Sequence, residues 1–238
     1  MGRSIAEQSV RDLGGRLSVL TRQKKDHIEL ERLLQQLRDA NGAEQGRVLL
    51  RLHRLVFPHA FAEEAVLWPV LRRVLPDGHE LTLEVEREHQ EVNELVTRLE
   101  ATAPGDPARE CLLDRLAEVL REDVRDEEDV LLPRLQAALG RARLRALGLV
   151  WEVVRRTAPT RAHPVVARRP PGNVVAAVPL SILDRLRDLV DGAALRSPGR
   201  AAPALHRTGA RLADVAHRLE HLPVMRRGED PGTSSSGG

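Results

Sequence analysis

The sequence predicts an all-α protein: an up-down-up-down four-helix bundle with additional C-terminal helices. In four successive segments of the first half of the chain, apolar residues recur every three or four positions, as on the buried face of a helix. Short loops containing glycine or proline separate these segments, at residues 41–42, 76–78 and 104–107. Helices joined by short loops lie antiparallel to their neighbours, which favours the bundle.

Each of the four predicted helices also carries metal-binding side chains within its apolar row. They are His27 in the first helix, His59 and Glu63 in the second, His89 in the third, and Asp123 and Glu127 in the fourth. A lone histidine on an apolar face is more often a hydrogen-bonded core residue than a ligand. Buried carboxylates, however, are costly unless they are paired, protonated or bound to a cation. Six such groups on core faces therefore indicate a shared metal site.

The loop positions place these residues at one level of the bundle. Counted from the first loop, His27 lies about 15 residues back and His59 about 17 residues forward, roughly 22 and 25 Å at 1.5 Å per residue. Glu63 and His89 are each about 12 to 14 residues from the second loop. His89 and Asp123 are each about 16 to 18 residues from the third. We therefore expect all four helices to present ligands to one layer.

An internal repeat relates the second helix to the fourth. Residues 59–69 (HAFAEEAVLWP) correspond to residues 123–133 (DVRDEEDVLLP). Each repeat ends in a proline six residues after the inward glutamate, where the missing backbone donor predicts a kink. Glu64 and Glu128 point off the apolar rows. They are interpreted as solvated, or as hydrogen-bond acceptors for the ligands, rather than as ligands.

This set of motifs resembles the hemerythrin-like, or HHE cation-binding, domain family. The resemblance rests on a single histidine, then His-x-x-x-Glu, then Glu-His, then an equivalent of His-x-x-x-Glu, and it covers roughly residues 15 to 140. It implies a four-helix bundle that holds a non-haem di-iron centre. Carried over by motif, His27, His59 and His89 would be imidazole ligands, and Glu63 and Glu127 bridging carboxylates.

Two positions depart from the family pattern. Asp123 stands where the last histidine is expected, and Asn93 follows His89 by one turn where the oxygen carriers of the family have a further histidine. A carboxylate is a harder, anionic ligand that favours a higher oxidation state, which argues against reversible dioxygen carriage. We expect Asp123 to ligate one metal directly. Iron is the expected metal, with manganese or zinc as alternatives.

Other histidines are weaker candidates. His53 precedes His59 by six residues, which places it on a different helix face. His217 and His221 form a His-x-x-x-His pair with Asp214 nearby, but both fall off the apolar row of their segment. We interpret them as surface histidines rather than as a second metal site.

Composition narrows the function classes. The chain has 238 residues with two tryptophans, two phenylalanines and no tyrosine, so the core is aliphatic and no tyrosyl radical is available. A single cysteine, Cys111, excludes an internal disulfide and fits a reducing cytoplasm. No apolar run reaches the roughly 18 residues that cross a bilayer, and no signal-peptide core is present, so no membrane partner is expected. Arginine clusters occur without aromatic or recognition motifs, and no nucleic-acid partner is expected either.

Past Gly140 the character of the chain changes. We expect a bundle with a trailing helix over residues 1–157, a Pro/Arg-rich connector over 158–178, a C-terminal helical pair over 179–224 and a disordered tail over 225–238. The connector could link freely or lie as a strap over the bundle. The helical pair carries an apolar face that must pack on the bundle or on another subunit, as in a homodimer. That face comprises Ile182, Leu186, Leu189 and Val190.

Three functional hypotheses follow. The first is a metalloprotein that binds or senses O2, NO or peroxide, or handles iron. The second is an oxidase or a peroxide-decomposing enzyme that uses the same site. The third is a metal-free helical interaction module, in which Asp123 marks a decayed site.

Overall fold

All regular structure in the computed structural model is helical, and no strand occurs in residues 2–103, 105–196, 199 and 202–233, which the structure describes. The all-α prediction is confirmed. The helices are α1 (Val19–Asp39), α2 (Gly42–Ala62), α3 (Trp68–Val74), α4 (Gly78–Ala101), α5 (Ala108–Asp126), α6 (Leu132–Ala138), α7 (Arg141–Thr157), α8 (Gly172–Ala194) and α9 (Ala202–Glu220). Short turns η1 (Ile5–Glu7), η2 (Glu63–Leu67), η3 (Glu127–Leu131) and η4 (Pro223–Arg226) complete them.

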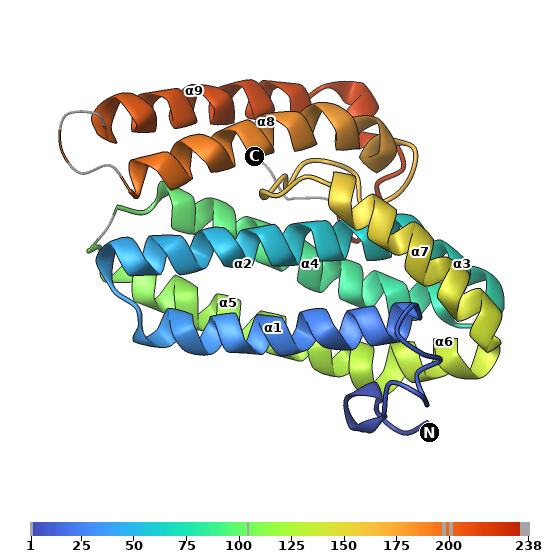
Figure 1. Ribbon diagram of the computed structural model, residues 1–238. Helices are drawn as coiled ribbons and strands as arrows, with labels where there is room; N and C mark the ends of the chain where they lie inside the picture. The colour runs from blue at the N-terminus through green and yellow to red at the C-terminus, as the bar shows by residue number, and fades with distance from the viewer. Residues whose placement is uncertain (1, 104, 197–198, 200–201, 234–238) are drawn as a thin grey trace.

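Four rods form the bundle and run alternately up and down (Figure 1). The rods are α1, then α2 with η2 and α3, then α4, then α5 with η3 and α6. Only two residues separate α1 from α2. There, Gly42 adopts a φ of 54°, a left-handed conformation that glycine reaches without a Cβ clash. The short loop therefore reverses the chain at once, as the antiparallel arrangement requires.

The two repeats contain wide turns of the same kind. Both η2 and η3 are π-helical, and each begins at the inward glutamate of its repeat. Pro69 and Pro133 follow within the first turn of α3 and α6, where a missing backbone donor is tolerated. The kink expected at the prolines is thus a π turn that starts at the glutamates. Such turns are rare and are frequent at functional sites.

Two apolar clusters fill the bundle, one on each side of a polar layer. The first includes Leu33, Leu52, Leu99 and Leu116 and lies toward the α1–α2 loop. The second holds both tryptophans and the leucines of α3 and α6. Full burial of one leucine stabilises the fold by about 1.5–3 kcal/mol, so these clusters can hold polar groups between them out of contact with water.

Helix α7 packs across the end of the bundle and belongs to it (Figure 1). Trp151 is fully buried in the second cluster. Gly148 lies against the backbone before α1, where a Cβ would come within 2.1 Å of the carbonyl oxygen of Leu17. Only glycine permits this close approach, and it fixes α7 beside α1.

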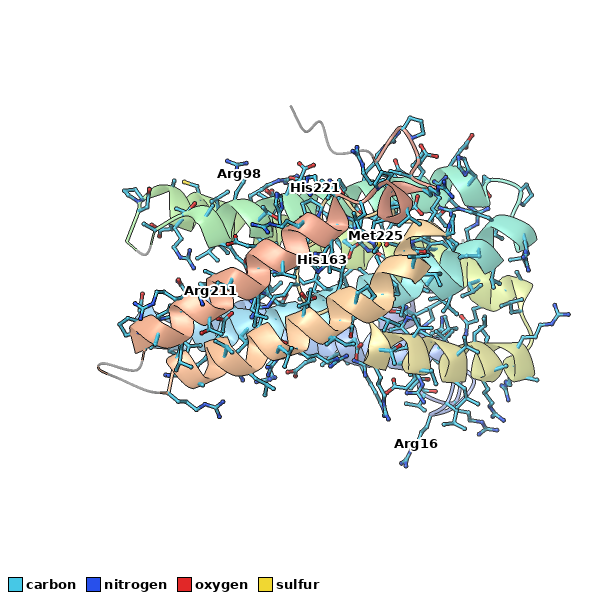
Figure 2. The ribbon with its side chains drawn as sticks, turned by 90° about the horizontal axis from the view of Figure 1, so that it is seen from above. Arg16, Arg98, His163, Arg211, His221 and Met225 are labelled. Carbon is cyan, nitrogen blue, oxygen red and sulfur yellow. The ribbon has the colours of Figure 1, made fainter. Side chains whose placement is uncertain are left out.

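Residues 158–171, here called the strap, lie packed between the bundle and the α8–α9 hairpin. Arg161, His163 and Arg168 are buried, and Arg161 donates to Asp188 of α8 at 2.8 Å. Figure 2 looks onto α8 and α9, with His163 between them. Of the two arrangements left open by the sequence, the structure has the strap rather than a free linker.

Helix α8 begins at Gly172, earlier than the expected start at Pro179, which lies inside the helix. Tertiary contacts explain the difference. Asn173 donates from its side chain to the backbone carbonyl of Arg168 at 2.9 Å, and Ala176 is buried. These contacts hold the first turns of α8 in helical form despite the proline.

The chain after α9 is also packed, where disorder was expected from residue 225. The backbone N–H of Ala167 donates to the carbonyl of Met225 at 2.9 Å, and that of Gly172 to the carbonyl of Arg227 at 2.9 Å. Met225 and Thr233 are buried. In the structure the part of the expected tail up to Thr233 is thus packed, and its remainder, 234–238, lies outside the described residues. None of the helices that the structure describes combines the length and apolar character needed to span a membrane.

Candidate metal centre

The structure brings all six candidate ligands together in the polar layer. His27, His59, Glu63 and Glu127 form one group, in which one ligand-capable atom of each lies within 4.8 Å of the others. His89, Asp123 and Glu127 form a second group by the same measure; five of the six residues are buried, and the side chain of His59 is 12% exposed. Glu127 belongs to both groups. The layer therefore offers two neighbouring cation positions that share one carboxylate.

Contacts between the inner atoms link the two groups further. Glu63 places one carboxylate oxygen 3.1 Å from His59 Nε2 and the other 3.7 Å from His89 Nε2. Glu127 Oε2 lies 3.1 Å from His27 Nε2. Both glutamates thus stand where a carboxylate can contact two ions at once.

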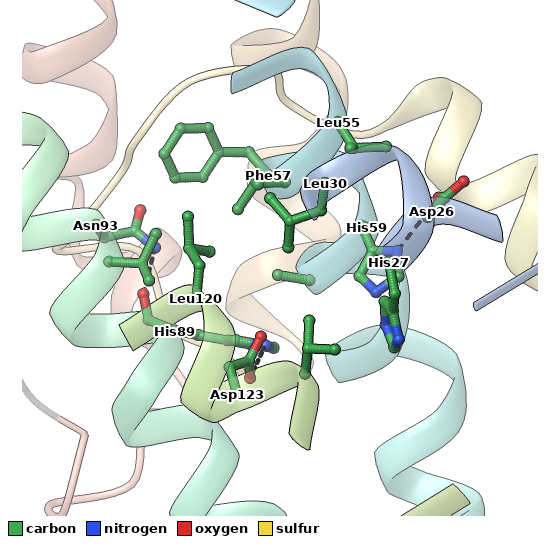
Figure 3. A pocket seen from close by; sticks show the side chains of 14 residues that line it. Asp26, His27, Leu30, Leu55, Phe57, His59, His89, Asn93, Leu120 and Asp123 are labelled. Atoms are coloured by element: carbon green, nitrogen blue, oxygen red, sulfur yellow. Dashed lines mark hydrogen bonds and ion pairs between the residues drawn. The ribbon is translucent and has the colours of Figure 1, made fainter. Parts of the chain in front are cut away.

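Asp123 faces into the layer rather than toward solvent. Its Oδ1 lies 3.5 Å from His89 Nε2, and the residue is buried (Figure 3). The aspartate that replaces the expected histidine is therefore available to a metal ion in the second group.

Each of the three histidines is held through Nδ1 by an outer carboxylate. The pairs are His27 with Glu128 at 2.9 Å, His59 with Asp26 at 3.2 Å, and His89 with Glu64 at 2.9 Å. An ionised carboxylate only accepts, so each Nδ1–H donates and each Nε2 is left to face the layer. Metal-ligating histidines in proteins are oriented in this way.

For two of these outer carboxylates, the sequence left open whether they are solvated or bind the histidines. Glu64 and Glu128 were interpreted as solvated or as acceptors for ligands, and both accept from histidines. A π turn carries more residues per turn than an α-helix, which keeps the second glutamate of each repeat near the bundle interior. Asp26 was missed, because it is adjacent to His27 in sequence but its partner, His59, lies on another helix.

Electrostatics in the layer favour a bound cation. Burial, together with the neighbouring charges of Glu63 and Asp123, raises the pKa of Glu127 to about 8. Burial opposes protonation of His27, but the adjacent carboxylates of Glu127 and Glu128 outweigh this effect and raise its pKa to about 9. The layer thus holds excess negative charge that only protons or metal ions can balance.

Unpaired buried atoms point to the same conclusion. Seven inner atoms make no hydrogen bond of acceptable geometry: His27 Nε2, His89 Nε2, Asp123 Oδ1 and both carboxylate oxygens of Glu63 and of Glu127. Each unsatisfied buried polar group costs about 1–3 kcal/mol. Metal ions would satisfy all seven, so the residues present fit a two-metal centre.

Comparison with known proteins agrees with this geometry. Residues 18–135 match the family model of the hemerythrin HHE cation binding domain. These residues form a domain of this family. The matched residues span the four rods and all six candidate ligands, so the resemblance inferred from the motifs is confirmed.

Relatives of the HHE protein include two curated sequences. An uncharacterized hemerythrin-like protein of Schizosaccharomyces pombe is 27% identical over 173 residues, which cover 70% of this chain and 83% of that protein. This match is longer than the HHE domain and so extends beyond it. A DNA nickase of Nostoc sp. is 26% identical over 114 residues, which cover 48% of this chain and 32% of that protein. No solved structure matches.

Two buried tryptophans border the HHE layer. Trp151 of α7 contacts His59 edge-on, with ring centroids 5.4 Å apart. Trp68 stacks on His89, with ring centroids 6.4 Å apart. The guanidinium of Arg155 lies over the Trp151 ring at 5.3 Å. Residues 18–135 do not include α7, so a helix outside the matched domain packs against one of the candidate ligands, His59.

A small apolar cavity adjoins the layer in the HHE bundle (Figure 3). Its walls include Leu30, Leu55, Phe57 and Leu120, and its floor includes His27, His59, His89 and Asp123. The volume open to the centre of a water-sized sphere is about 20 Å³. One water molecule requires about 10–15 Å³ by this measure, so the cavity suits a single diatomic or similarly small molecule.

The remaining histidines lie outside the HHE layer. His53 is buried beside Phe57, with ring centroids 5.6 Å apart, and belongs to neither ligand group of the layer. His217 and His221 are at the surface near the end of the chain. The exposure of His217 and His221 agrees with the surface position expected from the sequence.

Proposed function

We propose that the HHE domain binds two iron ions in the polar layer and uses them to bind or sense a small ligand, either O2, NO or peroxide, or to handle iron itself. His27, His59, Glu63 and Glu127 would hold one ion, and His89, Asp123 and Glu127 the other. Bound iron would supply an open coordination position and a change of oxidation state. The observation that carries this proposal is the pair of buried ligand groups that share Glu127.

The donor set supports sensing or redox chemistry over reversible dioxygen transport. Three imidazoles and three carboxylates form a mixed set that suits iron and also accommodates manganese or zinc. Asp123 adds negative charge at the second position, beside His89. This charge favours the higher oxidation state of a bound metal.

The cavity supports a small ligand. Leucine and phenylalanine side chains line it and make the approach to the layer apolar. Its volume limits the ligand to a few atoms. A larger organic substrate would require displacement of Leu30 or Phe57, which pack in the first apolar cluster.

Metal content is the direct test of the two-ion centre. The full chain would be loaded with ferrous iron under nitrogen and desalted, and metal per chain measured by mass spectrometry together with an optical spectrum in air. We expect about two irons per chain, about one in Asp123→Ala, and a loss of both in Glu127→Ala because the two groups share that carboxylate. His206→Ala, an exposed histidine on α9, is the matched control. Folded protein that retains no metal would contradict the proposal.

Peroxide decomposition at the same site is the second candidate. Asp26 both lines the cavity and contacts His59, which places an acid–base group beside the ligand space. Peroxide consumption by iron-loaded protein, absent from Glu63→Ala, would establish turnover. The third hypothesis, a decayed site, has less support, because Asp123 faces His89 inside the layer.

We also propose that the α8–α9 hairpin pairs with a second copy of the chain in the cytoplasm. Three of the four residues of the expected apolar face are exposed, Ile182 by 57%, Leu186 by 47% and Leu189 by 65%, while Val190 is half-buried. Two hairpins joined through these faces would form a second four-helix bundle. Light scattering should give a dimer for the wild type and a monomer for Ile182→Glu. A wild-type monomer at micromolar concentration would refute the pairing.

A further inference from the structure

A second cluster of metal-ligating side chains lies at the end of α9, apart from the HHE layer. His217, Glu220 and His221 each offer one ligand-capable atom, and these atoms lie within 4.8 Å of one another. Spacings of three and four residues place them on one face of the helix. The sequence suggested Asp214 as the acidic neighbour, but the structure has Glu220 instead. Figure 2 shows His221 where α9 ends.

Both imidazoles are held by hydrogen bonds through Nδ1. His217 Nδ1 lies 2.9 Å from a carboxylate oxygen of Glu220, and His221 Nδ1 lies 2.8 Å from the backbone carbonyl of His217. Carboxylate and carbonyl oxygens only accept, so both Nδ1 atoms donate and both Nε2 atoms carry a free lone pair. Histidines that ligate metals in proteins are oriented by the same two kinds of acceptor.

Glu220 is itself fixed in place. The residue is only 5% exposed, and its second carboxylate oxygen lies 3.1 Å from Nδ1 of His163 in the strap. The Nε2 of His163 in turn lies 3.2 Å from Asp184 of α8. The acceptor that orients His217 is therefore anchored to two other segments of the chain.

The two imidazoles are open to solvent, unlike those of the HHE layer. The side chains of His217 and His221 are 69% and 46% exposed, and their ring centroids are 4.3 Å apart. An ion could reach them without any rearrangement of the fold. Two imidazoles without a thiolate select borderline divalent ions such as Zn²⁺, Ni²⁺ and Cu²⁺.

We infer that His217 and His221 form a surface site for a divalent transition-metal ion, bound through one nitrogen of each imidazole. Glu220 positions His217 and adds negative charge beside the ion, and water completes the coordination. The site is separate in space and in residues from the proposed iron layer, so either can bind metal without the other.

The test is a zinc titration of the full chain after its HHE layer has been loaded with iron. Calorimetry should show one Zn²⁺ bound per wild-type chain, with affinity at least about tenfold lower in His221→Ala. His206→Ala removes an exposed histidine from the same helix and should bind zinc as the wild type does. Because all three positions are exposed or at the helix end, circular dichroism should show equal folding.

Histidine modification locates the ion. Zn²⁺ should protect His217 and His221, but not His206, from carbethoxylation as measured by mass spectrometry of peptides. Zinc binding that persists in the His217→Ala/His221→Ala double variant would overturn the assignment. So would absence of binding in the wild type, or an equal loss in His206→Ala. Failure of the HHE layer to hold iron would change the total metal count but not these differences between variants.

Discussion

His163 makes the strap sensitive to pH, because it is a buried imidazole between two carboxylates. Its nitrogens lie 3.1 Å from Glu220 and 3.2 Å from Asp184, which belong to different helices. Burial alone would lower the pKa of His163, but the hydrogen bonds to Asp184 and Glu220 outweigh it and raise the pKa from 6.5 to about 9. The folded chain therefore binds this proton more tightly than the unfolded chain does.

The size of the effect follows from the shift. One pKa unit corresponds to about 1.4 kcal/mol, so a rise from 6.5 to about 9 contributes about 3 kcal/mol to the free energy of unfolding. Because the raised pKa belongs to the folded state, the whole contribution is present below pH 6.5 and is lost as the pH rises through 9.

Urea unfolding of the wild type and of His163→Gln measures this contribution. Glutamine keeps a hydrogen-bond donor but cannot take up a proton. At equal metal loading, we expect the difference in unfolding free energy between the two proteins to shrink by about 3 kcal/mol from pH 6 to pH 9.5. The exposed His206→Gln is the control and should show no such trend. A difference that stays constant over this range would show that His163 is not a buried cation.

Three further outcomes are expected. Gly148→Ala should lower the melting temperature measured by calorimetry, since its Cβ would meet the carbonyl of Leu17 at 2.1 Å; an unchanged value would show that α7 adjusts freely. Iron loading should raise the melting temperature of the wild type but not of Glu127→Gln, because metal binds the folded state only; an equal rise in both would place the metal elsewhere. Burial lowers the pKa of His53 to about 4, so the wild type loses stability as the pH falls from 6.5 to 4. His53→Leu should reduce this loss by about 3 kcal/mol. Parallel pH profiles of the two proteins in denaturant titrations would contradict this expectation.

The bundle and its polar layer could be predicted because both depend on local periodicity. A helical repeat identifies which side chains share a face, and loop positions give their height along the helix axis. His27 and His59 lie on either side of one short loop at nearly equal distances from it. The geometry therefore followed from counting residues, and no knowledge of long-range packing was needed.

The outer carboxylates and the strap depend on contacts between distant segments. Asp26 of α1 accepts from His59 of α2, and Glu64 of η2 accepts from His89 of α4. No spacing within one helix records such a pairing. The strap has the proline and arginine content of a flexible linker. Arg161 is nevertheless buried, because its guanidinium forms ion pairs with Asp188 and Asp191 of α8. Burial of an arginine thus depends on carboxylates from a distant segment, which the local sequence of the strap does not reveal.

The strap gives the two halves of the molecule a common set of hydrogen bonds. Asn93 donates to the backbone carbonyl of His89 at 2.8 Å and accepts from the backbone N–H of His163 at 2.9 Å. His163 in turn contacts α8 through Asp184 and α9 through Glu220. A displacement of α4 at His89 must lengthen or shorten at least one of these bonds. Five residues, His89, Asn93, His163, Asp184 and Glu220, thus form a continuous hydrogen-bonded route from the layer to the buried sides of α8 and α9.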